Sequence, residues 1–304
     1  MSKIKKYLLV TFVSAWLLQI IGSSDLQLDS VGGTLSFSYS LAFCMFMPTL
    51  GAFAAKADIR EMGWRLHPKQ NYKYILFAWL APTLFQLAGA ALYFLVFPGD
   101  LDLSGSFLAD NRPEVFAELQ ASGKSYGDYI MQKIFSSLTS CYTFIGILMG
   151  LGEEIGWRGF LFPELDTYLG RTKAVLIGGV IHGVWHFPVI LLAGYEYGTD
   201  YIGAPLLGMI AFCIFTLTTG IISYWLYERS SSIWLPAISH GMVNATFNPY
   251  MLRGAEHFER SVFGPVDIGL ISGIPYVIAA AVILHLANKR ERMEYDLFRT
   301  NLSN

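Results

Sequence analysis

The chain has 304 residues, of which 54% are hydrophobic and only 14% are charged, and its formal net charge at pH 7 is −2. Soluble domains carry about 25% charged residues, so this composition, with its repeated long apolar runs, indicates a polytopic membrane protein. The near-zero net charge provides no basic surface for nucleic acid. Three scattered cysteines inside apolar runs do not predict a disulfide framework.

A spanning helix requires about 20 mostly apolar residues, and eight segments of the sequence meet this description. They cover 7–23, 36–55, 74–97, 134–152, 174–193, 204–227, 233–252 and 266–287. The sequence therefore predicts one all-α, polytopic membrane domain with about eight transmembrane helices. For description, 1–133 holds the first three helices and an acidic loop, 134–252 holds three motifs, and 253–304 holds the last helix and a basic tail.

The distribution of Lys and Arg sets the expected orientation of the chain. If the N-terminus is cytoplasmic, 16 of the 21 basic residues fall in cytoplasmic segments and 5 in outer loops. We therefore expect an integral protein of the cell membrane with both termini in the cytoplasm. The longest loop, 98–133, then lies outside, and its segment PEVFAELQ begins with a proline suited to the first position of a short helix.

Two adjacent carboxylates and an arginine follow the fourth apolar segment, in the stretch GEEIGWRGFLFPEL (152–165). In a continuous helix over 145–162, Glu154 and Arg158 are four residues apart and share a face. Because an unpaired charge in the bilayer is expensive, this spacing predicts an ion pair, and a structural brace is its favoured role. Glu153 lies about 100° round the helix and is left to face another group.

Two later segments each place two polar side chains on one helix face. IHGVWHFPV puts His182 and His186 four residues apart, and SHGMVNATFN puts His240 and Asn244 at the same spacing. In the predicted topology these residues and Glu153 share one depth near the cytoplasmic side. A single histidine in a membrane helix is usually a satisfied core residue, but this set is better explained by a functional site.

A carboxylate, imidazoles and an amide at one depth suit hydrolysis. A desolvated glutamate acts as a general base toward water, and a histidine holds that water or protonates a leaving amine. An imidazole and an amide donate hydrogen bonds to the oxyanion of a tetrahedral intermediate. A nucleophilic serine is not indicated, because Ser239 beside His240 lacks the glycine context of a nucleophile elbow.

The three motifs together resemble those of the CPBP family of intramembrane proteases, which includes CAAX-processing and bacteriocin-processing members and the type II CAAX prenyl endopeptidases. The family motifs EExxxR, FxxxH and HxxxN correspond to EEIGWR (153–158), HGVWH (182–186) and HGMVN (240–244). The resemblance covers roughly residues 140–250. It implies an endopeptidase that cuts a membrane-associated or lipidated protein or peptide.

The resemblance also implies roles for the motif residues. Glu153 and His186 would be the water-activating pair, and His240 and Asn244 would form the oxyanion site. Glu154 and Arg158 would support them from the first motif.

One departure from the family pattern concerns His182, which stands where the family has phenylalanine. It either takes over the packing of that ring or adds a second imidazole to the site. Two histidines four residues apart have the spacing of zinc ligands, although the glutamate of an HExxH motif is absent. Family members are often labelled metalloproteases. The candidate ligands for a zinc ion are Glu153, His182, His186 and His240, and a metal-free, glutamate-activated water is favoured.

Two other functions compete with proteolysis. Carboxylates and histidines in membranes also build ion pathways, so a proton-coupled transporter or channel is one alternative. Such a pathway requires polar groups through the full depth of the membrane, whereas these cluster at one side. The other alternative is a non-catalytic family member that binds a peptide as an immunity or scaffold protein, and the intact motifs argue against it.

Overall fold

The structure is a computed structural model that describes residues 2–27, 31–254 and 258–302, without the side chains of Val31 and of 290–302. The described chain is helical, and its only β-structure is an isolated bridge between Leu101 and Arg253. The main helices are α1 (Ser2–Leu26), α2 (Val31–Cys44), α3 (Met47–Ala54), α4 (Pro68–Val96), α7 (Tyr126–Thr139), α8 (Cys141–Gly156), α9 (Phe162–Leu169), α10 (Arg171–Trp185), α11 (Phe187–Ala193), α12 (Leu206–Ser230), α13 (Trp234–Ala245) and α14 (Ile274–Leu302).

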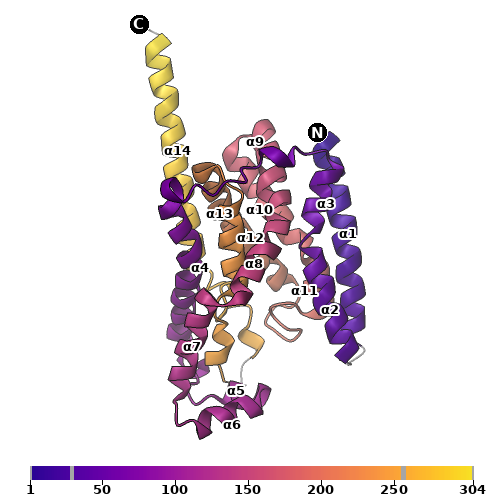
Figure 1. Ribbon diagram of the computed structural model, residues 1–304, viewed down its shortest axis with the longest axis vertical. Coiled ribbons are helices and arrows are strands. Elements are labelled where there is room, and N and C mark those ends of the chain that lie inside the picture. Colours follow the sequence, from indigo (N-terminus) through magenta and orange to yellow (C-terminus); the bar gives the residue numbers. More distant parts are fainter. Residues whose placement is uncertain (1, 28–30, 255–257, 303–304) are drawn as a thin grey trace.

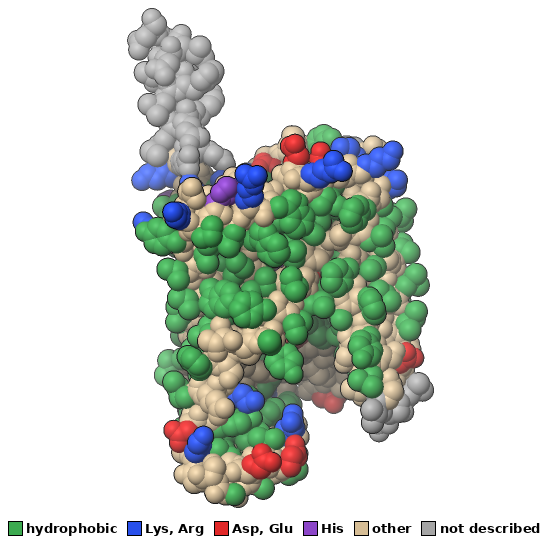
Figure 2. Space-filling model, viewed as in Figure 1, with side chains coloured by type: hydrophobic (Ala, Val, Ile, Leu, Met, Phe, Trp, Pro, Cys, Tyr) green, Lys and Arg blue, Asp and Glu red, His purple; other side chains and the backbone are tan. Residues whose placement is uncertain are grey.

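The long helices form one bundle, and both ends of the chain lie at the same end of it (Figure 1). Hydrophobic side chains cover the sides of the bundle as a broad band, and Lys and Arg side chains gather above this band at the end where the termini lie (Figure 2). Such a band is the surface that a bilayer requires. The expected all-α, integral membrane fold is therefore confirmed.

Fewer long helices are present than the eight expected spans. In the described ranges, five helices are long and apolar enough to cross a membrane, and α7 with α8 makes a sixth if this bent pair counts as one span. The pair is bent by 47° at Ser140, whose extended backbone (ψ 161°) ends α7 and begins α8. A serine is favoured at such a boundary because its hydroxyl competes with the helical hydrogen bonds.

The apolar helical parts of the last two expected spans are shorter than predicted. Helix α13 ends at Ala245, and Asn248 then caps the 3-10 turn η4 (Pro249–Leu252). A residue before proline is disfavoured in the helical conformation, so the expected helix over 233–252 stops early. Helix α14 begins only at Ile274, because turns occupy the preceding residues of the expected span 266–287.

The outer loop carries the short helix that its sequence predicts. Helix α6 (Pro113–Ala121) begins with Pro113 at its first turn, as expected. Together with α5 (Ser106–Asn111) it lies at the end of the bundle opposite the two chain termini (Figure 1). The hydroxyl of Tyr126 at the start of α7 donates to the carbonyl of Met251 in η4, which ties this loop to the bundle.

Glycines bring the helices that carry the motifs into backbone contact. A Cβ atom at Gly241 of α13 would lie 2.4 Å from the backbone nitrogen of Ile147 on α8, and one at Gly183 of α10 would lie 2.8 Å from the Cα of Cys213 on α12. Cβ atoms do not approach so closely, so both positions require glycine. Close approach at small residues is how membrane helices associate. These contacts join α8 to α13 and α10 to α12, the helices that surround the motif residues.

Candidate active site

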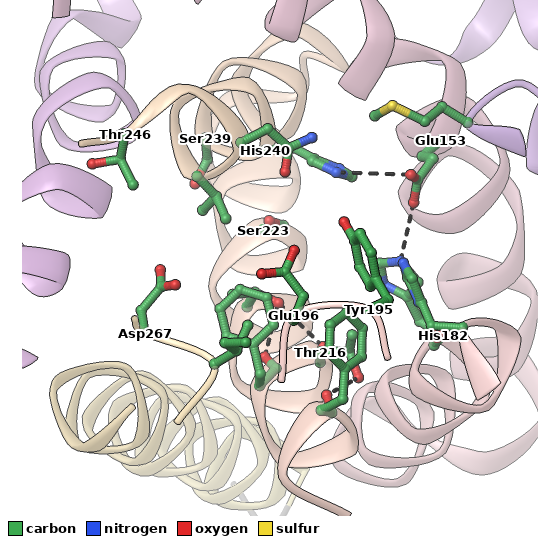
Figure 3. A pocket seen from close by; sticks show the side chains of 18 of the residues that line it. Glu153, His182, Tyr195, Glu196, Thr216, Ser223, Ser239, His240, Thr246 and Asp267 are labelled. Carbon is green, nitrogen blue, oxygen red and sulfur yellow. Dashed lines mark hydrogen bonds and ion pairs between the residues drawn. The ribbon is translucent and has the colours of Figure 1, made fainter. Parts of the chain in front are cut away.

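The residues of all three motifs meet in the interior of the bundle. Glu153 lies near the end of α8, His182 near the end of α10 and His240 in the middle of α13. Figure 3 shows the side chains of His182 and His240 both directed at Glu153. His182 is eleven residues beyond the start of α10, which is about 16 Å along the helix axis. That distance is about half the thickness of the hydrocarbon layer of a bilayer.

A π-helical turn follows the two carboxylates. The expected continuous helix changes at Trp157, and residues Trp157–Leu161 form the π turn η3, in which the N–H of Phe162 donates to the carbonyl of Trp157. Pro163 gives a reason, because a proline ring clashes with the carbonyl four residues before it in a regular α-helix. Single π turns occur frequently at functional sites.

Glu153 is almost fully buried, and one of its oxygens is occupied by two partners. Oε2 lies 3.0 Å from Nε1 of Trp157 and 3.0 Å from Nε2 of His182. The indole N–H can only donate, so Oε2 accepts. The other oxygen, Oε1, lies 3.9 Å from Nε2 of His240, which is too long for a hydrogen bond. Oε1 is thus the oxygen that remains for a ligand.

Glu154 forms the ion pair that the sequence predicts. Its Oε1 accepts from Nη1 of Arg158 at 2.8 Å, and both side chains are buried. The same oxygen lies 2.8 Å from Nδ1 of His240. The guanidinium of Arg158 also lies over the ring of Phe162, 4.9 Å from its centroid. Glu154 therefore connects the expected brace to the third motif.

The two histidines of the second motif have different surroundings. His182 reaches Glu153, and its ring packs 4.7 Å from the ring of Trp157. His186 is the C-cap residue that follows α10, and its Nδ1 lies 3.1 Å from the carbonyl oxygen of His182. Its ring packs against Phe212, with centroids 4.5 Å apart. The histidine that contacts Glu153 is therefore the one without a family counterpart.

A cavity of about 430 Å³ joins the motif residues. Its lining includes Glu153, His182, His186, His240 and Asn244, and Asn244 follows His240 by one turn of α13. The structure thus brings every candidate catalytic residue to one space.

Several lining residues lie outside the motifs. Gln19 of α1 donates from Nε2 to the carbonyl of Trp185 and accepts from the N–H of Val189, and so holds the backbone on both sides of His186. The hydroxyl of Tyr195 points toward the space between Glu153 and His240 (Figure 3). A polar glutamine in an apolar helix was the one sequence signal for Gln19, and Tyr195 had no signal.

The described residues do not fit a zinc site. They contain no group of three or more His, Cys, Asp or Glu side chains that could hold a metal ion. Nε2 of His182 is directed at Glu153, whereas Nδ1 of His186 is directed at a backbone carbonyl. The two histidines with zinc-ligand spacing therefore do not present these nitrogens to a shared point, and no step proposed below uses a metal.

Comparison with known proteins finds similarity in the part of the chain that carries this site. Residues 135–246, which contain all three motifs, match a family model described as type II CAAX prenyl endopeptidase Rce1-like. The resemblance to the CAAX protease family that the motifs indicated is confirmed for this part of the chain. A curated relative, the CAAX prenyl protease 2 of Methanococcus maripaludis, is 29% identical over 145 residues, which are 47% of this chain and 48% of that protein. The match thus spans about half the length of the relative.

Replacement of Arg158 by alanine tests the brace. It leaves the charge of Glu154 buried without its cation, and we expect the free energy of unfolding in detergent micelles to fall by about 3–5 kcal/mol. The control is Arg112→Ala, which removes an ion pair with Glu114 whose side chains are 66% and 62% exposed. Such surface pairs contribute little. Equal unfolding midpoints for the two variants would show that Arg158 does not brace the site.

Proposed function

We propose that this protein is an intramembrane endopeptidase that hydrolyses a peptide bond of a membrane-associated or lipidated protein or peptide. The observation that carries the proposal is the cavity in which Glu153 meets histidines from two other helices. A buried carboxylate with one oxygen directed at a cavity is suited to activate water. A carboxylate, imidazoles and an amide around one cavity favour an enzyme over a non-catalytic scaffold.

Glu153 is the proposed general base. Trp157 and His182 fix its Oε2, and Oε1 accepts a proton from a water in the cavity while the water oxygen attacks the peptide carbonyl carbon. Fixed partners avoid reorganisation during the reaction. In this assignment His182 is a positioning residue and takes the place beside Glu153 that the family resemblance gave to His186, and His186 contributes to the wall of the cavity.

His240 is the proposed partner in proton transfer. Oε1 of Glu154 accepts a hydrogen bond from Arg158 and another from Nδ1 of His240, so the proton of the neutral imidazole lies on Nδ1. The second ring nitrogen, Nε2, lies on the side of Glu153. Glu153 then passes the proton of the attacking water from Oε1 to Nε2 of His240, and the imidazolium donates to the oxyanion or passes this proton to the leaving amine. The side-chain amide of Asn244, one turn along α13, is the second proposed donor to the oxyanion.

The proposed orientation places the end of the bundle that holds both termini in the cytoplasm. Lys and Arg side chains gather at that end (Figure 2), as the bias of cytoplasmic loops requires. The helix pair α5 and α6 then lies outside the membrane on the far side (Figure 1). The cell membrane remains the proposed location, and the bilayer and a polypeptide substrate are the proposed partners.

Replacement of Glu153 by glutamine tests the catalytic assignment. The amide keeps the shape of the side chain but cannot take a proton, so we expect cleavage to fall by about 10²–10⁴-fold with little change in the unfolding midpoint. The substrate is sought by quantitative proteomics of new peptide ends in membranes that contain either the wild type or the variant. Glu118→Gln, on the exposed face of α6, is the matched control. Wild-type cleavage by purified Glu153→Gln would refute the assignment.

Replacement of His182 by phenylalanine separates packing from positioning. The ring fills the same space beside Trp157 but removes the contact with Oε2 of Glu153, and we expect kcat to fall about 10–100-fold with KM unchanged. His182→Gln keeps a donor and should recover part of kcat. If His182→Phe retains the wild-type kcat, His182 only replaces the packing of the family phenylalanine.

Reporter fusions test the orientation. A reporter that is active only in the cytoplasm should be active when fused after residue 304 and inactive when inserted in the loop between α6 and α7. The reverse pattern would place the proposed cytoplasmic end of the bundle outside.

A further inference from the structure

The cavity has a second polar end that the three motifs do not account for. Two carboxylates line it: Glu196, in the loop between α11 and α12, and Asp267, in the turns before α14. Figure 3 shows both side chains in the pocket that contains Glu153 and His240. Neither residue has a part in the chemistry proposed above.

Asp267 is buried with a poorly satisfied acceptor. It is 4% exposed, and its backbone N–H donates to Oε1 of Gln86 at 2.9 Å. The hydroxyl of Tyr276 is directed at its carboxylate, but within the described chain neither that hydroxyl nor Oδ2 of Asp267 reaches full hydrogen-bond geometry. A buried carboxylate oxygen with a poorly aligned donor is costly. A donor supplied by a ligand would remove this cost.

Gln86 supplies an independent indication of the ligand. Its side chain is fully buried on α4 and lines the same cavity, and Nε2 has no acceptor among the described residues. Since Oε1 is fixed by the N–H of Asp267, the direction of the amide is set. The site therefore offers an unused N–H donor of Gln86 beside a poorly satisfied carboxylate acceptor of Asp267. A polypeptide with a backbone carbonyl and a cationic side chain satisfies both.

Glu196 stands where this cavity meets a second one. It lines both the large cavity and a neighbouring cavity of about 350 Å³, which also contains Asp200. Its backbone is in the left-handed region (φ 70°), which a residue with a side chain rarely adopts and which recurs at ligand sites. Burial raises the pKa of the Glu196 carboxyl, so its charged form gains from a cation nearby.

No described lysine or arginine that lines either cavity is free to neutralise these carboxylates, and the buried Arg253 lies behind the second cavity, over the rings of Tyr250 and Phe258. Among the described residues that line either cavity, the one such side chain is Arg158, and Arg158 is paired with Glu154. Opposite charges interact strongly where water is largely excluded. A free carboxylate at the end of a peptide would be repelled from this end of the cavity, whereas a lysine or arginine side chain would be attracted.

We propose that Glu196, Asp267 and Gln86 form a subsite for a lysine or arginine side chain of the polypeptide substrate, which reaches the catalytic cavity past Asp200. This inference rests on the proposed function, and it names the kind of polypeptide that the proposed endopeptidase would prefer. The scissile bond at Glu153 then belongs to a segment with a basic residue near the cut, and the segment in the subsite continues beyond it rather than ending there in a carboxylate.

A binding experiment tests the subsite separately from catalysis. The full chain with Glu153→Gln is purified in detergent, and three fluorescein-labelled apolar peptides are titrated by fluorescence polarisation. They carry lysine, norleucine or glutamate at one central position and are amidated at the C-terminus. We expect the lysine peptide to bind about tenfold more tightly than the norleucine peptide, as a charged hydrogen bond provides, and the glutamate peptide to bind least.

Variants in the same background locate the effect. Glu196→Gln and Asp267→Asn keep the side-chain shapes, and each should reduce the preference for the lysine peptide over the norleucine peptide. In the double variant this preference should fall below about twofold. Glu118→Gln is again the matched control and should keep the preference. Unfolding midpoints verify that each variant is folded. A preference for lysine that both variants retain, or equal binding of the three peptides, would overturn the proposal.

Cleavage of the same peptides by the wild type keeps the two proposals apart. If the lysine peptide binds through Glu196 and Asp267 but is not cut, the subsite stands and the proposed endopeptidase activity fails for this peptide class. If lysine and norleucine peptides are cut with equal kcat/KM, the activity stands and the subsite is refuted. Faster cleavage of the lysine peptide, lost in Glu196→Gln, supports both.

Discussion

The rest of this structure depends on two adjacent carboxylates that lie inside a membrane bundle. Burial of such charges is tolerated only where partners are supplied. Glu153 finds donors on the π turn that continues its helix and on α10, and Glu154 finds them on the same π turn and on α13. Three helices must therefore meet at one point, and the close approach at Gly241 allows two of them to do so.

Glu154 shows that a structural and a chemical role can share one atom. Its Oε1 accepts from Arg158, which stabilises the fold, and from His240, which faces the base. The brace therefore also sets which nitrogen of His240 carries a proton. A change at Arg158 reaches the catalytic residues through a single oxygen, although Arg158 has no direct contact with the proposed reaction.

Local spacing predicted part of the site well. The pairing of Glu154 with Arg158 follows from a separation of four residues, and it holds although a π turn begins at Trp157. The meeting of the motifs followed from their family resemblance and their common depth. The choice between His182 and His186 could not be predicted, because it depends on α10 ending at Trp185, which takes His186 out of the helical line.

The fold prediction also failed where a helix ends within an apolar segment. Average hydropathy over a window finds apolar segments but does not respond to a single residue that ends a helix. Ser140 divides one expected span and the turn at Pro249 shortens another. Glu196 and Asp267 lie in irregular segments without a motif, so nothing in the sequence indicated that they share a cavity with Glu153. Their proximity results from tertiary packing alone.

The π turn at Trp157–Leu161 acts as a one-residue insertion placed immediately after the carboxylates. The extra residue is absorbed within this turn, so α9 keeps the faces that it would have behind a regular helix one residue shorter. If the same residues formed an uninterrupted α-helix, α9 would be rotated by about 100°, which would remove Phe162 from Arg158 and Asp166 from the hydroxyl of Tyr224 that it binds at 2.9 Å. Two chains with an identical first motif can therefore differ in how the helix behind it is attached to the bundle.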